Sequence, residues 1–292
     1  MSFLTSGDED ILPRALRQNG GFHLACNWYL REFEPLPYQY GYHHIQQMNS
    51  TWLAGIAAGK TRGAAASCLI DCLSIPYFKV LNTSVTAKQA ELPFDMFMAW
   101  YEGNERLEHL VEDIKLRPWP TVKFKNWSVW EFRTAGTNAR FIRGTEYDRI
   151  VFDECGLDYD GEIVKVLRGR LRGVRADGTK RMARLDCMTS PTDAPWLRER
   201  YERGIKGGEK PRHPRYVSLK TKTRDNIRLT EDQIQAMEAE YTDEMIEVEM
   251  NAEFPDYGMS MFPHSHIIAC THQEFNDICY MALYPEEGLA KR

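Results

Sequence analysis

The sequence AGIAAGKT at residues 54–61 carries the clearest chemistry in this chain. It fits a phosphate-binding loop, or P-loop, with alanine at the first glycine position. Small residues let successive backbone N–H groups surround a phosphate, Lys60 would reach the β- and γ-phosphates, and the Thr61 hydroxyl would hold Mg²⁺. A small-residue turn with a chance Gly-Lys-Thr is the alternative. The loop predicts a site for ATP and Mg²⁺ formed by Gly55, Ala57, Ala58, Gly59, Lys60 and Thr61.

Two carboxylates follow an apolar run at residues 149–152. The tip of a strand in a parallel sheet delivers its side chains to the crevice where α/β proteins bind ligands. There, Asp153 would hold a Mg²⁺-bound water, and Glu154 would polarise the water that attacks the γ-phosphorus. A strand followed by a helix N-cap is the alternative. Because the P-loop and the acidic strand occur in the expected order, they favour an ATPase.

A further apolar run, at residues 185–188, ends in Thr189, Ser190 and Pro191. The two hydroxyl groups are candidates to sense the γ-phosphate of a bound nucleotide. Many strands end in such residues simply to turn, so both interpretations stay open.

The elements that must position these residues alternate along the chain. The pattern predicts strands near residues 51–54, 78–83, 127–133, 149–152, 184–189 and 215–219, and helices over 11–34, 60–73, 87–100, 105–114 and 230–250. Apolar strands separated by helices indicate βαβ units. We therefore expect an α/β fold of the P-loop NTPase (ASCE/RecA-like) class, with a mainly parallel sheet flanked by helices and with Trp127 and Trp130 in its core.

The composition is that of a globular protein, with 43% hydrophobic and 27% charged residues. No apolar run approaches the roughly 18 residues that suggest a membrane helix, and the acidic start lacks the features of a secretory signal. Seven cysteines, an odd number with only Cys68 and Cys72 close together, indicate buried free thiols in a cytosol. These features argue against membrane and disulfide-rich secreted classes.

The net charge of −5 conceals an uneven distribution. Residues 161–230 carry 19 Lys and Arg against 8 Asp and Glu, whereas residues 231–260 carry 10 acidic residues and no Lys or Arg. A basic stretch of this kind suits the phosphates of DNA without base reading. A solvated face, or contact with an acidic neighbour, is the alternative. The candidate DNA contacts are Arg168, Arg170, Arg172 and Arg175.

Taken in order, the motifs resemble the ATPase domain of the large terminase subunit, a viral motor that packages double-stranded DNA into a procapsid. The resemblance covers roughly residues 36–262. Besides the P-loop and the acidic strand, it includes NTSVTAKQA at 82–90, FIRG at 141–144, TSP at 189–191 and AEFPDYGMSMF at 252–262. It implies that Tyr38 and Gln39 belong to the adenine-reading segment, with Gln39 bonded to the base edge.

The resemblance also implies a catalytic arginine. Terminase P-loops often contain an extra Arg, whereas this chain has Ala57 and Ala58 there, and Arg62 follows on the helix as a further candidate phosphate contact. We therefore expect Arg143, with Arg140 second, to act on the γ-phosphate from a neighbouring subunit. A surface arginine in a turn is the alternative.

Partners and domain organisation follow from the same resemblance. It implies double-stranded DNA, the portal protein and the small terminase subunit as partners, and a location in the host cell cytoplasm without membrane contact. The chain would form a ring, a pentamer, when assembled and be a monomer in isolation. The expected organisation is a helical preamble at 1–35, an ATPase core at 36–225, and a C-terminal helical lid and linker region at 226–292.

Few carboxylates follow Asp256. Because a two-metal nuclease needs several clustered carboxylates, we expect no nuclease activity, and we favour a truncated chain over a separate nuclease protein. Two rival functions stay open. One is a helicase-like translocase with two lobes, and the other is a nucleotide-gated assembly protein with little turnover.

Overall fold

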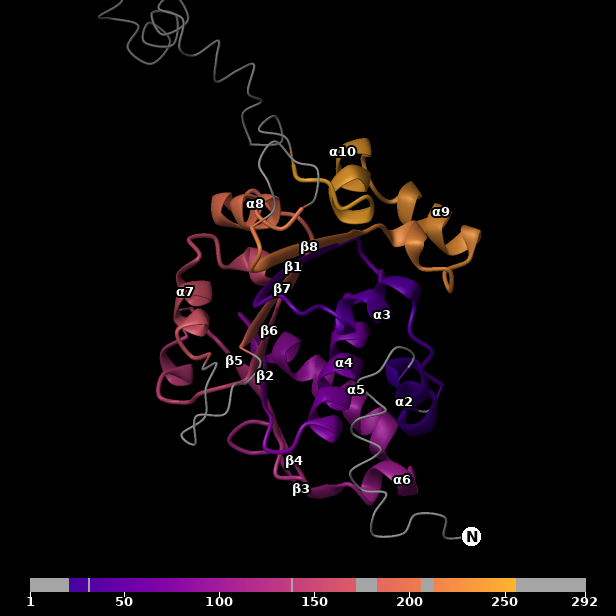
Figure 1. Cartoon of the computed structure of the whole chain (residues 1–292). Helices are drawn as coiled ribbons and strands as arrows, with labels where there is room; N and C mark the ends of the chain where they lie inside the picture. Colours follow the sequence, from indigo (N-terminus) through magenta and orange to yellow (C-terminus); the bar gives the residue numbers. More distant parts are fainter. Residues whose placement is uncertain (1–20, 31, 138, 172–182, 206–212, 256–292) are drawn as a thin grey trace, which may run out of the picture. The chain divides into compact units, whose positions relative to one another are not determined.

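The computed structural model describes residues 21–30, 32–137, 139–171, 183–205 and 213–255 (Figure 1). Its strands are β1 (Asn49–Ala54), β2 (Lys79–Ser84), β3 (Val111–Lys115), β4 (Thr121–Phe124), β5 (Val129–Thr134), β6 (Arg149–Asp153), β7 (Arg184–Thr189) and β8 (Tyr216–Thr221). Its α-helices are α2 (Gly21–Tyr29), α3 (Pro37–His43), α4 (Lys60–Ser74), α5 (Ala87–Tyr101), α6 (Glu105–Glu108), α7 (Glu162–Arg168), α8 (Pro195–Glu202), α9 (Glu231–Ala239) and α10 (Asp243–Met245). Three 3-10 turns, η1 (Arg140–Ile142), η2 (Cys155–Leu157) and η3 (Thr223–Asp225), and a π-helical turn, η4 (Ile246–Met250), complete the described elements.

The eight strands form one sheet with the order β3-β4-β5-β2-β6-β7-β1-β8. Every neighbouring pair from β5 to β8 is parallel. In the part of the chain that the structure describes, antiparallel pairing is confined to β3, β4 and β5. The predicted α/β fold with a mainly parallel sheet is therefore confirmed.

Helices cover both faces of the sheet. Figure 1 shows α3, α4 and α5 on one face and α7 and α8 on the other. Helix α4 is rich in small residues, and every residue from 63 to 72 is buried because the helix packs against β2, β5 and the neighbouring helices. Its thiols at Cys68 and Cys72 are free and buried, as predicted.

At one edge of the sheet, the structure has a short helix and a strand where the sequence predicts a single helix over residues 105–114. Helix α6 ends at Glu108, and β3 begins at Val111 and pairs with β4, with a bulge between Val111 and Asp113. Hydrogen bonds to β4 and the burial of Val111 outweigh the moderate helix propensity of this run. Local propensity is a weak guide here because the strand partner lies outside the segment itself.

The two tryptophans near β5 differ in their exposure to solvent. Trp130 is fully buried, as predicted, but Trp127 is 64% exposed and stacks on Tyr77. The placement of Trp127 in the core was therefore wrong. Its left-handed backbone, with a φ of 67°, places it in the turn before β5, so it does not take part in the alternation of the strand.

The segment after β8 is a series of short helices, where the sequence predicts one helix over 230–250. The capping box is present, because Thr230 and Gln233 exchange side-chain and backbone hydrogen bonds. A new N-cap at Thr242 then starts α10, and η4 follows it. The described residues up to Glu253 belong to one compact unit. The predicted boundaries at 35/36 and 225/226 and the predicted lid stay predictions. No described helix is long and apolar enough to span a bilayer.

A buried ion network links the central strands to α4. Asp186 of β7 accepts hydrogen bonds from Arg149 Nε at 2.8 Å and from Arg184 Nε at 2.6 Å. Arg149 also donates to Asp71 of α4 at 2.6 Å. Burial raises the pKa of Asp186, but the charges of Arg184 and Arg149 outweigh it and hold the pKa at about 2. The network fixes the start of β6, the strand that ends in Asp153.

Candidate active site at the phosphate-binding loop

The loop between β1 and α4 has the backbone shape of a P-loop. Ala57 and Gly59 adopt left-handed conformations, with φ values of 57° and 75°. Gly55 leaves no room for a side chain, because a Cβ there would lie 2.7 Å from Thr223 Oγ1 and closer still to the Met250 carbonyl oxygen. Gly59 is the N-cap of α4, a helix of 15 residues. The loop therefore ends at a helix N-terminus, which favours a bound anion.

Lys60 and Glu154 form an ion pair beside this loop, with Lys60 Nζ 2.8 Å from Glu154 Oε1. Burial lowers the pKa of Lys60, but the carboxylates of Glu154 and Asp153 outweigh it and raise the pKa above its ordinary value. Glu154 has a left-handed backbone with a φ of 49°. Such a conformation costs a non-glycine residue about 1–3 kcal/mol and is concentrated at functional sites.

Thr61 and Asp153 make the second contact between α4 and β6. The Thr61 hydroxyl donates to Asp153 Oδ2 at 2.7 Å, and burial raises the pKa of Asp153 to about 6. A hydroxyl and a carboxylate are the hard oxygen donors that Mg²⁺ prefers. Among the described residues, no group of three or more His, Cys, Asp or Glu is arranged so that these side chains alone could hold a metal ion. A magnesium ion held here would complete its coordination with phosphate oxygens and water.

Thr189 reaches the same site because β7 lies between β1 and β6. Its Oγ1 donates to Glu154 Oε2 at 3.2 Å. Ser190 follows at a bend and is half-buried. Gly156 was not singled out from the sequence, yet a Cβ at this position would lie 2.9 Å from Thr189 Oγ1. The segment after Glu154 thus packs tightly on the strand that contacts it.

Three hydrogen bonds hold the outer side of the loop. Thr223 Oγ1 donates to the Ile56 carbonyl at 2.7 Å, Asn226 Nδ2 donates to the Ala57 carbonyl at 2.8 Å, and Ile56 N–H donates to the Glu249 carbonyl at 2.6 Å. We call Thr223, Asn226 and Glu249 the loop brace. Sequence reasoning missed it because the two side-chain donors lie 167 and 169 positions from their acceptors. No local signal distinguishes them from ordinary turn residues.

The match to a known family spans the loop, the acidic strand and Thr189. A family model described as "Terminase large subunit, T4likevirus-type, N-terminal" matches residues 52–268, well over half of the chain. This chain belongs to the terminase large subunit family. A search of curated proteins finds no match.

Solved terminases share the fold of this chain. The ATPase domain of the Thermus phage P74-26 large terminase is 18% identical, with a TM-score of 0.58 over 82% of this chain and 98% of that domain. The HK97 bacteriophage large terminase is 12% identical, with a TM-score of 0.60 over 86% of this chain and 56% of that protein. A large terminase from a thermophilic bacteriophage, in complex with ADP, is 15% identical, with a TM-score of 0.53 over 80% of this chain and 53% of that protein. This chain spans about half the length of the last two proteins.

Tyr38 and Gln39, on α3 of this terminase, contact the backbone of the P-loop. Tyr38 Oη donates to the Ala58 carbonyl at 2.6 Å, and Gln39 Nε2 donates to the Gly59 carbonyl at 2.8 Å. Gln39 Oε1 accepts from Leu36 N–H at 2.8 Å, and the side chain is only 1% exposed. Gln39 therefore shapes the loop from behind. Its predicted contact with a base edge stays a prediction.

The candidate arginines of the terminase site lie at different places. Arg62 is exposed, and its guanidinium carbon lies 5.5 Å from the centroid of the Phe33 ring. Arg143 is exposed at the end of η1 and lines a surface pocket with Leu157, from the turn that follows Glu154. Arg140 is exposed within η1. Their predicted contacts with phosphate stay predictions.

The basic stretch proposed for DNA contact is described in part. Arg168 is the last residue of α7 and donates to the Ala183 carbonyl at 3.4 Å. Arg170 follows in the turn after this helix. Arg172 and Arg175 lie outside the described residues.

Proposed function

We propose that this chain is the ATPase motor domain of a phage large terminase, and that ATP hydrolysis at the P-loop drives translocation of double-stranded DNA into a procapsid. One observation carries the ATPase assignment. The residues from α4, Lys60 and Thr61, contact the residues at the end of β6, Glu154 and Asp153, directly. The large terminase of the thermophilic bacteriophage has been solved with ADP and with ATP-γ-S, which supports a nucleotide as the ligand of this fold.

Each side chain has a distinct task in hydrolysis. The backbone N–H groups of the loop bind the β-phosphate, and Lys60 leaves Glu154 to bind the γ-phosphate. This exchange frees the Glu154 carboxylate to accept a proton from the attacking water. Thr189, which donates to the other carboxylate oxygen, orients Glu154 during that step. Thr189 is thus a positioning residue that acts through Glu154.

The donor set fits magnesium. Thr61 would bind the ion directly, and Asp153 would bind one of its water ligands, since these two oxygens already lie 2.7 Å apart. When bound, Mg²⁺ neutralises charge on the phosphate oxygens.

Arg143 is the candidate for the cation that acts on the γ-phosphate from a neighbouring subunit. Its exposed position supports this role, as does its place in a pocket beside the turn that follows Glu154. Among the described residues, Arg143 has no ion-pair partner, so its exposed charge is available to a second subunit. The proposal requires a homo-oligomeric ring when the motor is assembled, and a pentamer is the form we expect.

The wider setting is that of a packaging complex in the host cytoplasm. We propose double-stranded DNA, the portal protein and the small terminase subunit as its partners. Arg168 and Arg170 would contact DNA phosphates without reading bases, as a motor that moves along any sequence requires.

Replacing Glu154 with glutamine tests the ATPase proposal. In Glu154→Gln we expect steady-state phosphate release to fall at least about 100-fold, because the amide keeps the size of the side chain but cannot accept the proton. Binding of a fluorescent ATP analogue should persist. Glu162→Gln, at an exposed glutamate that pairs with Lys165 on α7, is the control and should keep its turnover.

Two results would count against these assignments. Undiminished turnover in Glu154→Gln would remove Glu154 as the base. A wild-type protein that binds ATP without turnover, even with DNA present, would contradict the ATPase proposal and favour a nucleotide-gated assembly protein.

A further inference from the structure

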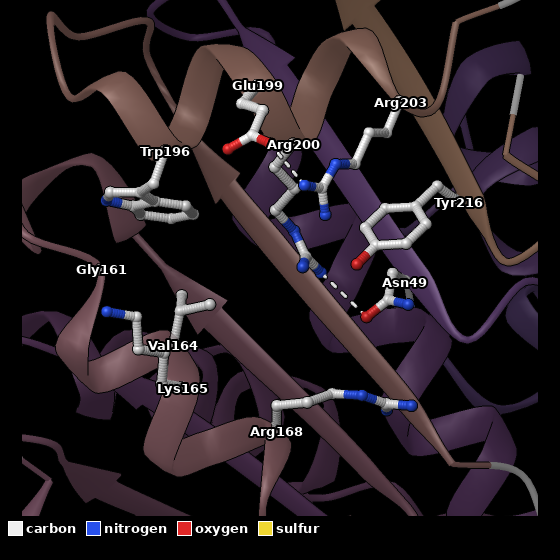
Figure 2. Close-up of a pocket in the computed structure, with 10 residues that line it drawn as sticks. All are labelled: Asn49, Gly161, Val164, Lys165, Arg168, Trp196, Glu199, Arg200, Arg203 and Tyr216. Carbon is white, nitrogen blue, oxygen red and sulfur yellow. Dashed lines mark hydrogen bonds and ion pairs between the residues drawn. The ribbon is translucent and has the colours of Figure 1, made fainter.

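A pocket of about 380 Å³ lies between α7, α8 and the first residues of β1 and β8 (Figure 2). Asn49 and Tyr216 begin these two strands, whereas the P-loop follows the last residue of β1. The pocket is therefore at the end of the sheet opposite to the site for ATP. We call it the arginine pocket, and its lining includes Asn49, Arg168, Trp196, Arg200, Arg203 and Tyr216.

Arg200 forms the floor of the arginine pocket and carries a buried charge. It is only 8% exposed, and its hydrogen bonds go to two neutral acceptors, Asn49 Oδ1 at 3.4 Å and the Leu185 carbonyl at 3.3 Å. Its Nε is buried without a hydrogen-bond partner among the described residues. A buried charge without a counterion is costly. A bound anion would therefore stabilise the buried charge of Arg200.

Arg168 adds a second positive charge to the same hollow. In Figure 2 the guanidinium group of Arg200 points toward Asn49, and the Arg168 side chain extends beneath these two residues. Its recorded acceptors, the Ala183 carbonyl and the Met48 sulfur, are uncharged. Burial lowers the pKa of Arg168, and the charge of Arg200 lowers it further. The two guanidinium groups therefore repel each other, and an anion between them would relieve the repulsion.

The described lining of the arginine pocket contains more basic than acidic side chains. Among the described residues that line the arginine pocket, Glu199 is the one acidic residue, and it pairs with Arg203 near Tyr216. The lining therefore carries a positive excess. Trp196 and Tyr216, both half-buried, supply flat aromatic surface on two sides.

We propose that the arginine pocket binds a phosphate group of the DNA backbone. Paired guanidinium groups match the oxygens of a phosphate, and the aromatic walls suit the apolar face of the sugar beside it. This inference rests on the proposed function in that it takes DNA as the ligand, but it assigns the contact to Arg200, Arg203 and the aromatic residues as well as to Arg168. In this proposal the DNA contact and the site of ATP hydrolysis lie at opposite ends of the sheet.

Two substitutions with opposite expected effects test the proposal. The probe is a fluorescein-labelled blunt duplex DNA without nucleotide, and anisotropy is measured over a range of salt concentrations. Arg168→Gln should weaken binding about 10-fold and reduce the salt slope by about one. Glu199→Gln should strengthen binding, because it removes the one acidic side chain of the described lining. A variant that merely unfolds cannot produce that gain.

Arg106→Gln is the matched control. Arg106 is an exposed arginine that stacks on Trp28 outside the arginine pocket, with its guanidinium carbon 3.7 Å from the ring centroid. Its removal takes away the same charge and should leave the affinity for the duplex unchanged.

Inorganic phosphate, added at constant ionic strength, distinguishes the two sources of the ligand. If it displaces the duplex, an isolated phosphate is sufficient. If it does not, while Arg168→Gln still weakens binding, the pocket needs the polymer. Both results support the proposal.

Unchanged affinity and salt slope in Arg168→Gln would overturn the proposal. A change in self-association by sedimentation without a change in DNA affinity would also overturn it, because the pocket would then accept a carboxylate from a second copy. Basal ATP turnover without DNA should be normal in Arg106→Gln. Failure of the inference is thus distinct from failure of the proposed function, which would show as no turnover in the wild type.

Discussion

At the scale of single residues, Asp186 illustrates how one carboxylate holds several elements of this fold in place. It accepts hydrogen bonds from Tyr42 of α3 and Ser50 of β1, besides Arg149 and Arg184. All of these side chains are fully buried or nearly so. Charges in such an environment depend on their partners, because little water is present to replace them.

Asp186→Asn should therefore lower the free energy of unfolding by about 3–5 kcal/mol. The amide keeps the shape of the side chain but leaves two buried guanidinium groups without their shared anion. Urea denaturation measures the change. Asp113→Asn, at an exposed residue 4.0 Å from Lys115, is the control and should cost no more than about 1 kcal/mol. A similar small loss in Asp186→Asn would show that the network adds little stability.

A comparison of the wild type with Asp186→Asn at several pH values tests the pKa of Asp186. The folded-state pKa of Asp186, about 2, lies below that of an unfolded aspartate, about 3.9. The unfolded state therefore binds the proton first, and the stabilisation by Asp186 is complete above about pH 4 and is lost as the pH falls toward 2. The difference in unfolding free energy between wild type and Asp186→Asn should shrink over this window. A constant difference would contradict the assigned pKa shift.

At the scale of elements, the central strands could be predicted because they are apolar and short and lie between helices. The edge strand β3 and the bounds of the short helices after Thr230 could not be predicted in this way. The first depends on pairing with another strand, and the second depend on where new helix caps occur. In the candidate site, local motifs marked Lys60, Thr61, Asp153 and Glu154, and the fold brings these four together. The loop brace and the buried contacts of Gln39 depend on tertiary packing, and no spacing in the sequence indicates them.

Gly55→Ala tests the fit between the P-loop and the loop brace. The added Cβ would meet Thr223 Oγ1 at 2.7 Å and the Met250 carbonyl, so the loop or the segment after β8 must shift. We expect a loss of about 1–3 kcal/mol in stability, as for other overpacked sites, and a higher KM for ATP. Calorimetry and steady-state kinetics measure the two effects.

Gly41→Ala is the matched control for that substitution. Gly41 lies on α3, and a Cβ there would meet nothing within 4 Å. It should gain up to about 1 kcal/mol from helix propensity and keep its KM. Equal behaviour of the two variants would show that the loop tolerates movement of its brace.

At the scale of the whole molecule, the exposed position of Arg143 predicts that active sites are shared between subunits. Lys60→Ala and Arg143→Ala should each lose most of their ATP turnover, since a catalytic arginine in trans contributes about 10³–10⁵ in rate in other P-loop enzymes. Mixed at concentrations where the wild type oligomerises, they should recover turnover. An intact P-loop from one variant then meets an intact arginine from the other.

A mixture of Lys60→Ala with Glu154→Gln is the control for subunit sharing. Lys60 and Glu154 act in the same subunit, and Arg143 would come from the neighbouring one. Each subunit in this mixture lacks either Lys60 or Glu154, so mixing cannot produce a complete active site. Equal turnover in the two mixtures would reject Arg143 as a residue that acts in trans.

From the loop brace we expect the phosphate-binding loop to respond to mechanical load. Thr223, Asn226 and Glu249 are hydrogen-bonded to the backbone that would surround the phosphates. A displacement of residues 223–250 would therefore alter the affinity for nucleotide. Thermodynamic linkage would make such a coupling reciprocal, so nucleotide binding would shift the equilibrium position of that segment by the same coupling free energy. Tension applied through this part of the chain would therefore change the rate at which ADP leaves.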